Sequence, residues 1–228
     1  MQAAQRRLSS SGCTFDAQNN IIMQNTGNYT FWALTIFLLF QSSCKENPIE
    51  TVETHDDEGR LERYERNKTD FAKEGLYQKL TPEGKLLEEA HYHQNQLQGE
   101  RKYFYPSGAV EIMEHYKNGQ LHGKYQKLTE TGAPYIEQDF IAGAMQGLSI
   151  RYYPNGNVEE RVTMKDNEEN GPFQEYYDNG NLKTEGTYTP VEEESALEQG
   201  ELKEYDENGQ LIRIADCVNG RCITRWKK

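Results

Sequence analysis

The 228-residue chain is poor in the residues that build large protein cores. Leu, Ile, Val and Phe together account for 42 residues, about 18 % of the chain, and the formal net charge is −12. This composition is typical of disordered chains, but 15 tyrosines and 19 glycines spread along the sequence indicate order. Basic stripes that could neutralise phosphates are also lacking, which disfavours nucleic acid as a partner and charge-driven docking on an anionic membrane.

Recognisable catalytic arrangements are missing as well. The chain has no Gly-x-Ser-x-Gly elbow, and none of its four cysteines stands in a pattern with histidine and aspartate that is typical of nucleophilic catalysis. Acidic residues are so abundant that their adjacency means little, and repeats would spread carboxylates apart instead of bringing a pair together in a cleft. We therefore expect a protein that is not an enzyme and uses no cofactor.

A metal site is not expected either. His115 and His122 are placed to face each other across a turn, which supplies only two ligands. His91 and Asp139 occupy the same repeat position as His115, but such positions lie two strands apart, roughly 9–10 Å. Zinc ligands lie about 2 Å from the metal, so this row cannot share one ion. We expect these histidine and aspartate side chains to face solvent and to contact residues on neighbouring strands.

One uncharged apolar segment stands near the N-terminus, at Phe31–Phe40, and small residues and Cys44 follow it. It is too short to span a bilayer as a helix, but its length is typical of a signal peptide. Small residues before a cysteine resemble the lipobox of bacterial lipoproteins, in which the cysteine is lipidated and becomes the new N-terminus. Gln41 departs from the aliphatic residue usual in that motif. The alternative is a short buried segment or an uncleaved anchor.

The resemblance to a lipoprotein signal divides the chain into three parts. Residues 1–43 are expected to be the signal peptide, with Met23 as an alternative start, and residues 44–57 to be the lipidated Cys44 and a polar linker. Residues 58–228 form the predicted folded domain. The location implied is the cell envelope, on the outer membrane and on either its periplasmic or its surface side, with membrane contact through the lipid anchor only.

Two sets of glycines recur through the body of the chain with a period of 24 residues, broken by an insertion near Thr189–Leu197. The first set is Gly59, Gly84, Gly108, Gly132, Gly156, Gly180 and Gly209. The second set is Gly75, Gly99, Gly123, Gly147, Gly171 and Gly200. Apolar and aromatic positions recur in step with both sets, so the chain is built of repeats.

Each repeat contains two turn signals. One is Tyr153-Pro154-Asn155-Gly156 and its equivalents, in which proline presets φ for the first turn position and glycine takes the left-handed third. The other is Asn-Gly between half-apolar runs, as at Asn118-Gly119 and Asn219-Gly220, which is a strong hairpin signal. Turn residues about every 12 positions leave no room for a long amphipathic helix.

These patterns predict an all-β fold, an elongated antiparallel β-meander of about seven β-hairpin repeats of ~24 residues each. Seven repeats imply about 14 strands. A closed barrel is the competing architecture, whereas a propeller would need a longer period. A thin repeated sheet needs only one or two bulky residues per strand, which reconciles the low apolar content with an ordered chain.

The two C-terminal cysteines are expected to form a disulfide. If Asn219-Gly220 is a two-residue turn, Cys217 pairs with Cys222 at a non-hydrogen-bonded position, where Cα atoms are about 4.5 Å apart. An exported protein meets an oxidising compartment, which favours the bond. Two free thiols are the alternative.

Aromatic residues form two rows. Phe104, Tyr152, Tyr176 and Tyr205 share one repeat position, and we expect them to be stacked core residues. Tyr105, Tyr153 and Tyr177 follow immediately in the chain and would point to the other face. If that face is open, these three form an aromatic row suited to binding a partner.

The recurring Tyr-x-Asn-Gly-x-Leu and Glu-x-x-Tyr-x-x-Gly-x-x-x-Gly pattern, clearest over Tyr105–Tyr125, resembles the MORN repeat variants of bacterial YwqK-type proteins. The resemblance covers roughly Asp56–Lys228. It implies the β-hairpin repeat fold and two functions: members are often described as antitoxins, and related repeats act as scaffolds or binding platforms.

Two functional hypotheses follow. The first is a cell-envelope lipoprotein whose repeat sheet binds another protein or a surface polymer. The alternative is an antitoxin or immunity protein whose acidic surface masks a basic toxin by charge complementarity.

Overall fold

The computed structural model describes residues 47–191 and 194–228, and its compact unit runs from Ile49 to Lys228. The predicted signal peptide and Cys44 lie outside the described residues. The unit contains only β-strands, and no described segment is a helix long and apolar enough to cross a membrane. The strands are β1 (Ile49–His55), β2 (Leu61–Asn67), β3 (Lys73–Leu80), β4 (Leu86–His93), β5 (Gln96–Phe104), β6 (Val110–Lys117), β7 (Gln120–Leu121), β8 (Gly123–Leu128), β9 (Pro134–Ile141), β10 (Ala144–Tyr152), β11 (Val158–Lys165), β12 (Glu168–Tyr176), β13 (Leu182–Val191), β14 (Glu194–Glu198), β15 (Gly200–Tyr205), β16 (Leu211–Val218) and β17 (Arg221–Lys227).

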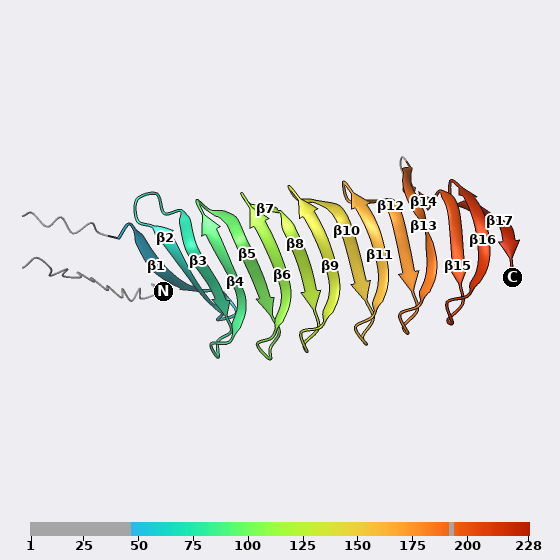
Figure 1. Ribbon diagram of the computed structural model, residues 1–228. Coiled ribbons are helices and arrows are strands. Elements are labelled where there is room, and N and C mark those ends of the chain that lie inside the picture. The colour runs from blue at the N-terminus through green and yellow to red at the C-terminus, as the bar shows by residue number, and fades with distance from the viewer. Residues whose placement is uncertain (1–46, 192–193) are drawn as a thin grey trace, which may run out of the picture. The chain divides into compact units, whose positions relative to one another are not determined.

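All 17 strands belong to one antiparallel sheet, in which neighbours in sequence are neighbours in space (Figure 1). The strands β6 and β13 each pair with two following strands, because β7–β8 and β14–β15 are each one interrupted strand of a hairpin. The predicted open meander of hairpins is therefore confirmed. The strand count exceeds the expected 14 because of these two interruptions and the additional strand β1.

Strand β1 corrects one boundary of the sequence interpretation. We expected a polar linker over residues 44–57, but Ile49–His55 pairs with β2 along its whole length, from Ile49 opposite Asn67 to His55 opposite Leu61. The linker prediction is wrong for these residues. The strand was missed because it has only two aliphatic residues, and charge pairs such as Arg66–Glu50 at 2.8 Å help to attach it to β2.

One edge of the sheet carries seven equivalent turns with the expected glycine chemistry. In each, the glycine N–H donates to the carbonyl three residues earlier, as Gly156 does to Tyr153 at 2.9 Å. The Tyr153 N–H in turn donates to the Asn157 carbonyl at 2.8 Å. This is a three-residue hairpin loop whose last residue is left-handed, and Gly156 accordingly has φ +89°.

The opposite edge carries two-residue turns in which both residues have positive φ. Examples are Asn118-Gly119, with φ of 51° and 77°, and Asn219-Gly220, with φ of 50° and 73°. Positive φ at both positions defines the type I′ turn, whose twist matches that of the strands. The second residue of such a turn also contacts the preceding repeat: the Gly119 N–H donates to the Leu97 carbonyl at 2.9 Å.

The second glycine set lies in bulges. Between β11 and β12 the pairing passes from Val162–Phe173 to Met164–Glu169, so that Thr163 alone faces residues 170–172. Gly171 sits in this bulge with φ +120°, and a Cβ there would lie 3.3 Å from the Thr163 Cβ. Only glycine satisfies both the backbone angle and the close approach.

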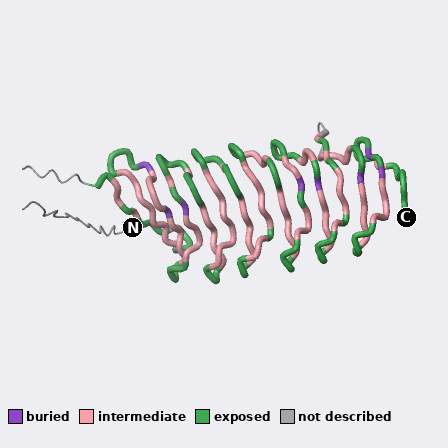
Figure 2. The backbone as a smooth tube through the Cα atoms, viewed as in Figure 1, coloured by how far each residue is buried: buried purple, intermediate pink, exposed green. Residues whose placement is uncertain are grey.

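Few side chains are buried, as expected for a sheet one layer thick (Figure 2). The buried residues are Ala72, Tyr77, Ala90, Val162, Phe173, Leu202, Ala215 and Cys217, all of them hydrophobic. We call the side of the sheet that carries Tyr77, Phe173 and Tyr188 the aromatic face. Its rings interact across strands: Tyr77–Tyr92 edge-on at 5.7 Å, Tyr125–Phe140 edge-on at 6.3 Å and Phe173–Tyr188 stacked at 4.2 Å.

The expected core row was wrong in its position. Tyr152, Tyr176 and Tyr205 are only half-buried, and their hydroxyls bond polar side chains: Tyr152 donates to Glu137 at 3.2 Å and Tyr205 to Glu185 at 2.9 Å. The buried row instead lies two residues after the bulge glycines. Its residue type changes from repeat to repeat, with Arg101 and Ser149 among the aromatics, so no conserved column marks it in the sequence.

Candidate functional site

The tyrosine row predicted to bind a partner connects consecutive repeats. The hydroxyls of Tyr105, Tyr153 and Tyr177 donate to the backbone carbonyls of Leu128 at 2.8 Å, Tyr176 at 2.8 Å and Tyr205 at 2.9 Å. All three rings are half-buried. Each tyrosine therefore bonds the last residue of a strand in the next repeat, namely β8, β12 or β15. Partner binding by the same residues stays a prediction.

In the other four turns at this edge, the residue three places before the turn glycine is not a tyrosine and makes a different contact. Thr81, Thr129, Asp56 and Asp206 accept hydrogen bonds from their own turn, as Thr129 Oγ1 does from the Ala133 N–H at 3.1 Å. A short polar side chain thus closes its own turn, whereas a tyrosine reaches the neighbouring repeat. The connections between repeats at this edge are consequently uneven along the sheet.

Two cations are built into the aromatic face. The Lys73 ammonium lies over the rings of Tyr64, Tyr77 and Tyr92, at 4.8, 4.8 and 5.2 Å from their centroids. Such cation–π contacts stabilise a charge in partly desolvated surroundings. Burial together with the nearby Glu88 and Glu62 charges raises the pKa of the Tyr77 hydroxyl.

Arg101 replaces an aromatic residue in the buried row and is paired with Glu88 at 2.8 Å. Glu114 lies 3.8 Å away on its other side, and the guanidinium stacks over the Tyr103 ring at 4.6 Å. Burial raises the pKa of Tyr103 to about 12. This site could not be predicted from the sequence, because a single Arg in a polar chain has no distinguishing pattern.

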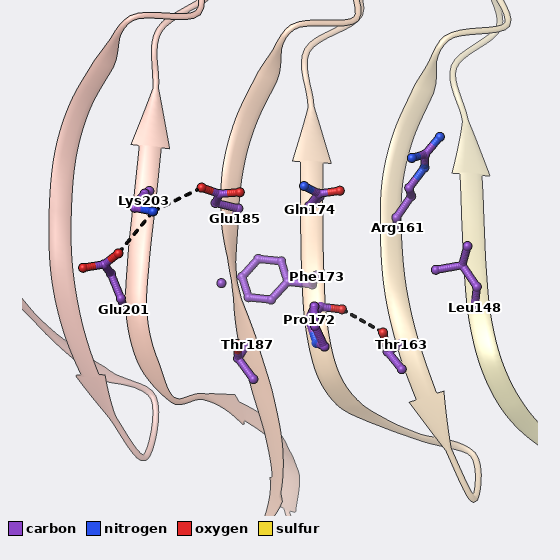
Figure 3. Close-up of a pocket in the computed structure, with 11 residues that line it drawn as sticks. Leu148, Arg161, Thr163, Pro172, Phe173, Gln174, Glu185, Thr187, Glu201 and Lys203 are labelled. Carbon is purple, nitrogen blue, oxygen red and sulfur yellow. Dashed lines mark hydrogen bonds and ion pairs between the residues drawn. The ribbon is translucent and has the colours of Figure 1, made fainter.

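Opposite the aromatic face lies a shallow depression of about 550 Å³ that crosses strands β10 to β15 (Figure 3). We call this side of the sheet the grooved face. The depression is lined by Leu148, Arg161, Thr163, Pro172, Phe173, Gln174, Glu185, Gly186, Thr187, Glu201 and Lys203. Sequence reasoning missed it because these residues come from five strands and belong to no single repeat column.

The charges at one end of the depression neutralise each other. Lys203 lies 3.5 Å from Glu185 and 3.2 Å from Glu201 (Figure 3). Glu201 also pairs with Arg225. These contacts lower the pKa of Glu201, with the Arg225 hydrogen bond as the largest cause. The Glu201 hydrogen bond raises the pKa of Lys203. At the other end, Arg161 lies over the Tyr176 ring at 5.8 Å.

The predicted cysteine pair meets at the C-terminal hairpin. Cys217 lies opposite Cys222 in the β16–β17 register, and the two are joined by a disulfide with a Cα–Cα distance of 3.9 Å. Cys217 is buried in the cluster around Phe173 and Leu202.

The histidine side chains are not brought together around a common point, although the backbones of His115 and His122 are hydrogen-bonded. His115 Nδ1 lies 2.8 Å from the Lys124 carbonyl oxygen, and the His122 N–H donates to the His115 carbonyl at 2.8 Å. Among the residues that the structure describes, no three His, Cys, Asp or Glu side chains are grouped to hold a metal ion.

The fold and its surfaces define a class of protein: a single-layer sheet of β-hairpin repeats with two accessible faces. Five segments match the family model of the MORN repeat variant, at residues 73–94, 97–118, 145–166, 169–189 and 198–216. These five segments are therefore similar to MORN repeat variants. No curated protein matches it. The hairpin of β8 and β9, which the family model omits, has the same turns and bulge as the others.

Proposed function

We propose that this protein is a non-enzymatic lipoprotein of the cell envelope, whose MORN-variant sheet is a binding platform for a protein or a surface polymer. The observation that carries the proposal is the single-layer sheet itself. Its buried residues are few, and the grooved face presents a depression of mixed polar and apolar character. Repeat proteins of this quasi-one-dimensional kind commonly bind partners on an extended surface.

Lipidation at Cys44 supplies the location in this proposal. The expected test is metabolic labelling with a palmitate analogue, which should tag the wild-type protein and leave Cys44→Ala unlabelled. A wild-type protein without label would end the lipoprotein part of the proposal, but would leave the binding function open.

The alternative, an antitoxin or immunity protein, is favoured by one feature of the turn edge. Exposed acidic side chains occur at five of the seven turns: Asp57, Glu83, Glu130, Asp178 and Glu207. A regular row of negative charge suits a basic partner, whose association would weaken with salt. Salt-sensitive co-purification with the product of a neighbouring gene would support this alternative, and the absence of any such complex would remove it.

A further inference from the structure

Arg161 differs from nearly every other arginine of the described chain. Of the nine arginines between residues 47 and 228, seven form ion pairs with carboxylates; Arg161 and Arg221 do not. In a chain of net charge −12, a guanidinium without a carboxylate is unusual. Arg161 also lines the depression, whereas Arg221 lies outside it, next to the last turn.

The surroundings of Arg161 orient it. Its guanidinium carbon lies 5.8 Å from the Tyr176 ring centroid, within the range of cation–π contacts. The Tyr176 hydroxyl donates to the side-chain oxygen of Gln174 at 2.8 Å, so the amide nitrogen of Gln174 serves as a donor at the depression. A planar guanidinium held in this way is suited to bidentate binding of a carboxylate.

Apolar side chains line the depression near Arg161, and short side chains form its base. Leu148 is 41 % exposed and lies opposite Thr163 in the β10–β11 pair, diagonal to Arg161, with Pro172 further along the depression (Figure 3). Thr163 and Thr187 are short, whereas the same repeat position carries longer side chains, Glu65 and His115, nearer the N-terminus. The short side chains therefore leave the hollow at this part of the sheet.

The other cation of the depression is already neutralised. Lys203 is held by Glu185 and Glu201, so Arg161 provides the uncompensated positive charge of the depression. Charge complementarity then calls for a carboxylate at Arg161, with an apolar group beside it on Leu148. No ring faces the depression openly, since Phe173 is 3 % exposed and Tyr176 lies beneath Arg161, so a flat sugar has nothing to stack on.

We propose that this depression binds an extended acidic peptide segment of a protein partner, with a carboxylate on Arg161 and a neighbouring apolar side chain on Leu148 and Pro172. The proposal rests on the binding-platform function and names the chemistry of the partner. The depression spans five strands, roughly 19 Å at the usual strand spacing. About six residues of extended chain cover that distance.

The test uses the full chain in detergent micelles and a fluorescein-labelled hexapeptide of alternating leucine and glutamate, followed by fluorescence anisotropy. Because hydrogen bonds to charged groups contribute about 1.5–3 kcal/mol, Arg161→Gln is expected to weaken binding about tenfold or more. Arg161→Lys keeps the charge but loses the bidentate geometry, so its affinity for the peptide should lie between those of the wild type and Arg161→Gln. Arg221→Gln is the matched control, because it removes the other unpaired arginine, and should bind as the wild type does.

Four results would overturn the proposal. Three of them are equal affinity for Arg161→Gln and wild type, equal binding of a control hexapeptide in which glutamine replaces each glutamate, and no binding of the acidic peptide by the wild type. Displacement of the bound peptide by oligogalacturonate at equal carboxylate concentration would also overturn it, in favour of an acidic polysaccharide. None of these results affects palmitate labelling at Cys44, so failure here is distinguishable from failure of the lipoprotein proposal.

Discussion

The contact between Tyr153 and the next repeat allows a quantitative test of what the tyrosine row does. The substitution Tyr153→Phe keeps the half-buried ring and removes only the hydroxyl that donates to the Tyr176 carbonyl at 2.8 Å. A neutral hydrogen bond contributes a net 0.5–1.5 kcal/mol to stability, so we expect a loss of about 1 kcal/mol. For the 180 residues of the unit Ile49–Lys228, this corresponds to a fall in Tm of roughly 2–4 °C.

The assay is thermal unfolding followed by circular dichroism, combined with hydrogen exchange by mass spectrometry. Exchange should increase locally, at the end of β12 and the Tyr177–Asn181 turn, because those backbone groups lose their connection to the preceding repeat. The control is Tyr135→Phe, since Tyr135 is 43 % exposed and its hydroxyl has no hydrogen bond among the described residues. Equal shifts for Tyr153→Phe and Tyr135→Phe would refute the structural role of the hydroxyl.

A combined variant extends the test. If the contacts are independent, changing Tyr105, Tyr153 and Tyr177 together to Phe should cost about 3 kcal/mol, the sum of three hydrogen bonds of about 1 kcal/mol each. Unchanged stability with lost partner binding would instead make the row a binding surface, as the sequence alone predicted.

Three further outcomes are expected. Gly186→Ala should destabilise the sheet by about 1–3 kcal/mol in urea unfolding, because its Cβ would lie 2.7 Å from Phe173 Cε1 and 2.9 Å from Leu202 Cδ1; a wild-type midpoint would contradict the packing described. Burial, with the Glu160 and Glu198 charges, raises the pKa of Glu169, so stability falls as pH rises from the ordinary glutamate range through that raised value. Glu169→Gln should therefore raise Tm at pH 7 and not at acidic pH, whereas the exposed Glu168→Gln should change neither, and a higher Tm at both pH values would refute this reasoning. In protein purified without reductant, the peptide that contains Cys217 and Cys222 should be lighter by two hydrogens in mass spectrometry, and free alkylated thiols there would exclude the disulfide.

The sequence identified the repeat because its turns depend on residue chemistry that is visible without a structure. Asn118-Gly119 and the Tyr153–Gly156 segment need left-handed backbone at fixed positions, and only a few residue types tolerate it. Two glycine columns in step then gave the period, the hairpins and their antiparallel order. The C-terminal cysteine pairing followed from the same turn register, because Asn219-Gly220 fixes which residues lie opposite each other.

The buried row, strand β1 and the depression could not be predicted from the turn residues, because they depend on how the strands pair away from the turns. The predicted core row lies five residues after the bulge glycines, whereas the buried row lies two residues after them and therefore on the opposite face of the sheet. The residue type at the buried position varies from Arg101 to Phe173, so the sequence does not mark it. Strand β1 is held by ion pairs and not by an apolar pattern, and the depression combines residues of five strands. Arg161 carries no sequence signal, because its significance lies in the carboxylate that it lacks among the described residues.

Position-specific crosslinking in cells tests most directly the central claim that the grooved face binds a partner. A photoreactive amino acid at Leu148, in the depression, is compared with one at Val218, a side chain 62 % exposed at the far turn. The account predicts a discrete adduct from position 148 that disappears in Arg161→Gln, and none from position 218. No adduct from position 148, or one that is unaffected by Arg161→Gln, would contradict it.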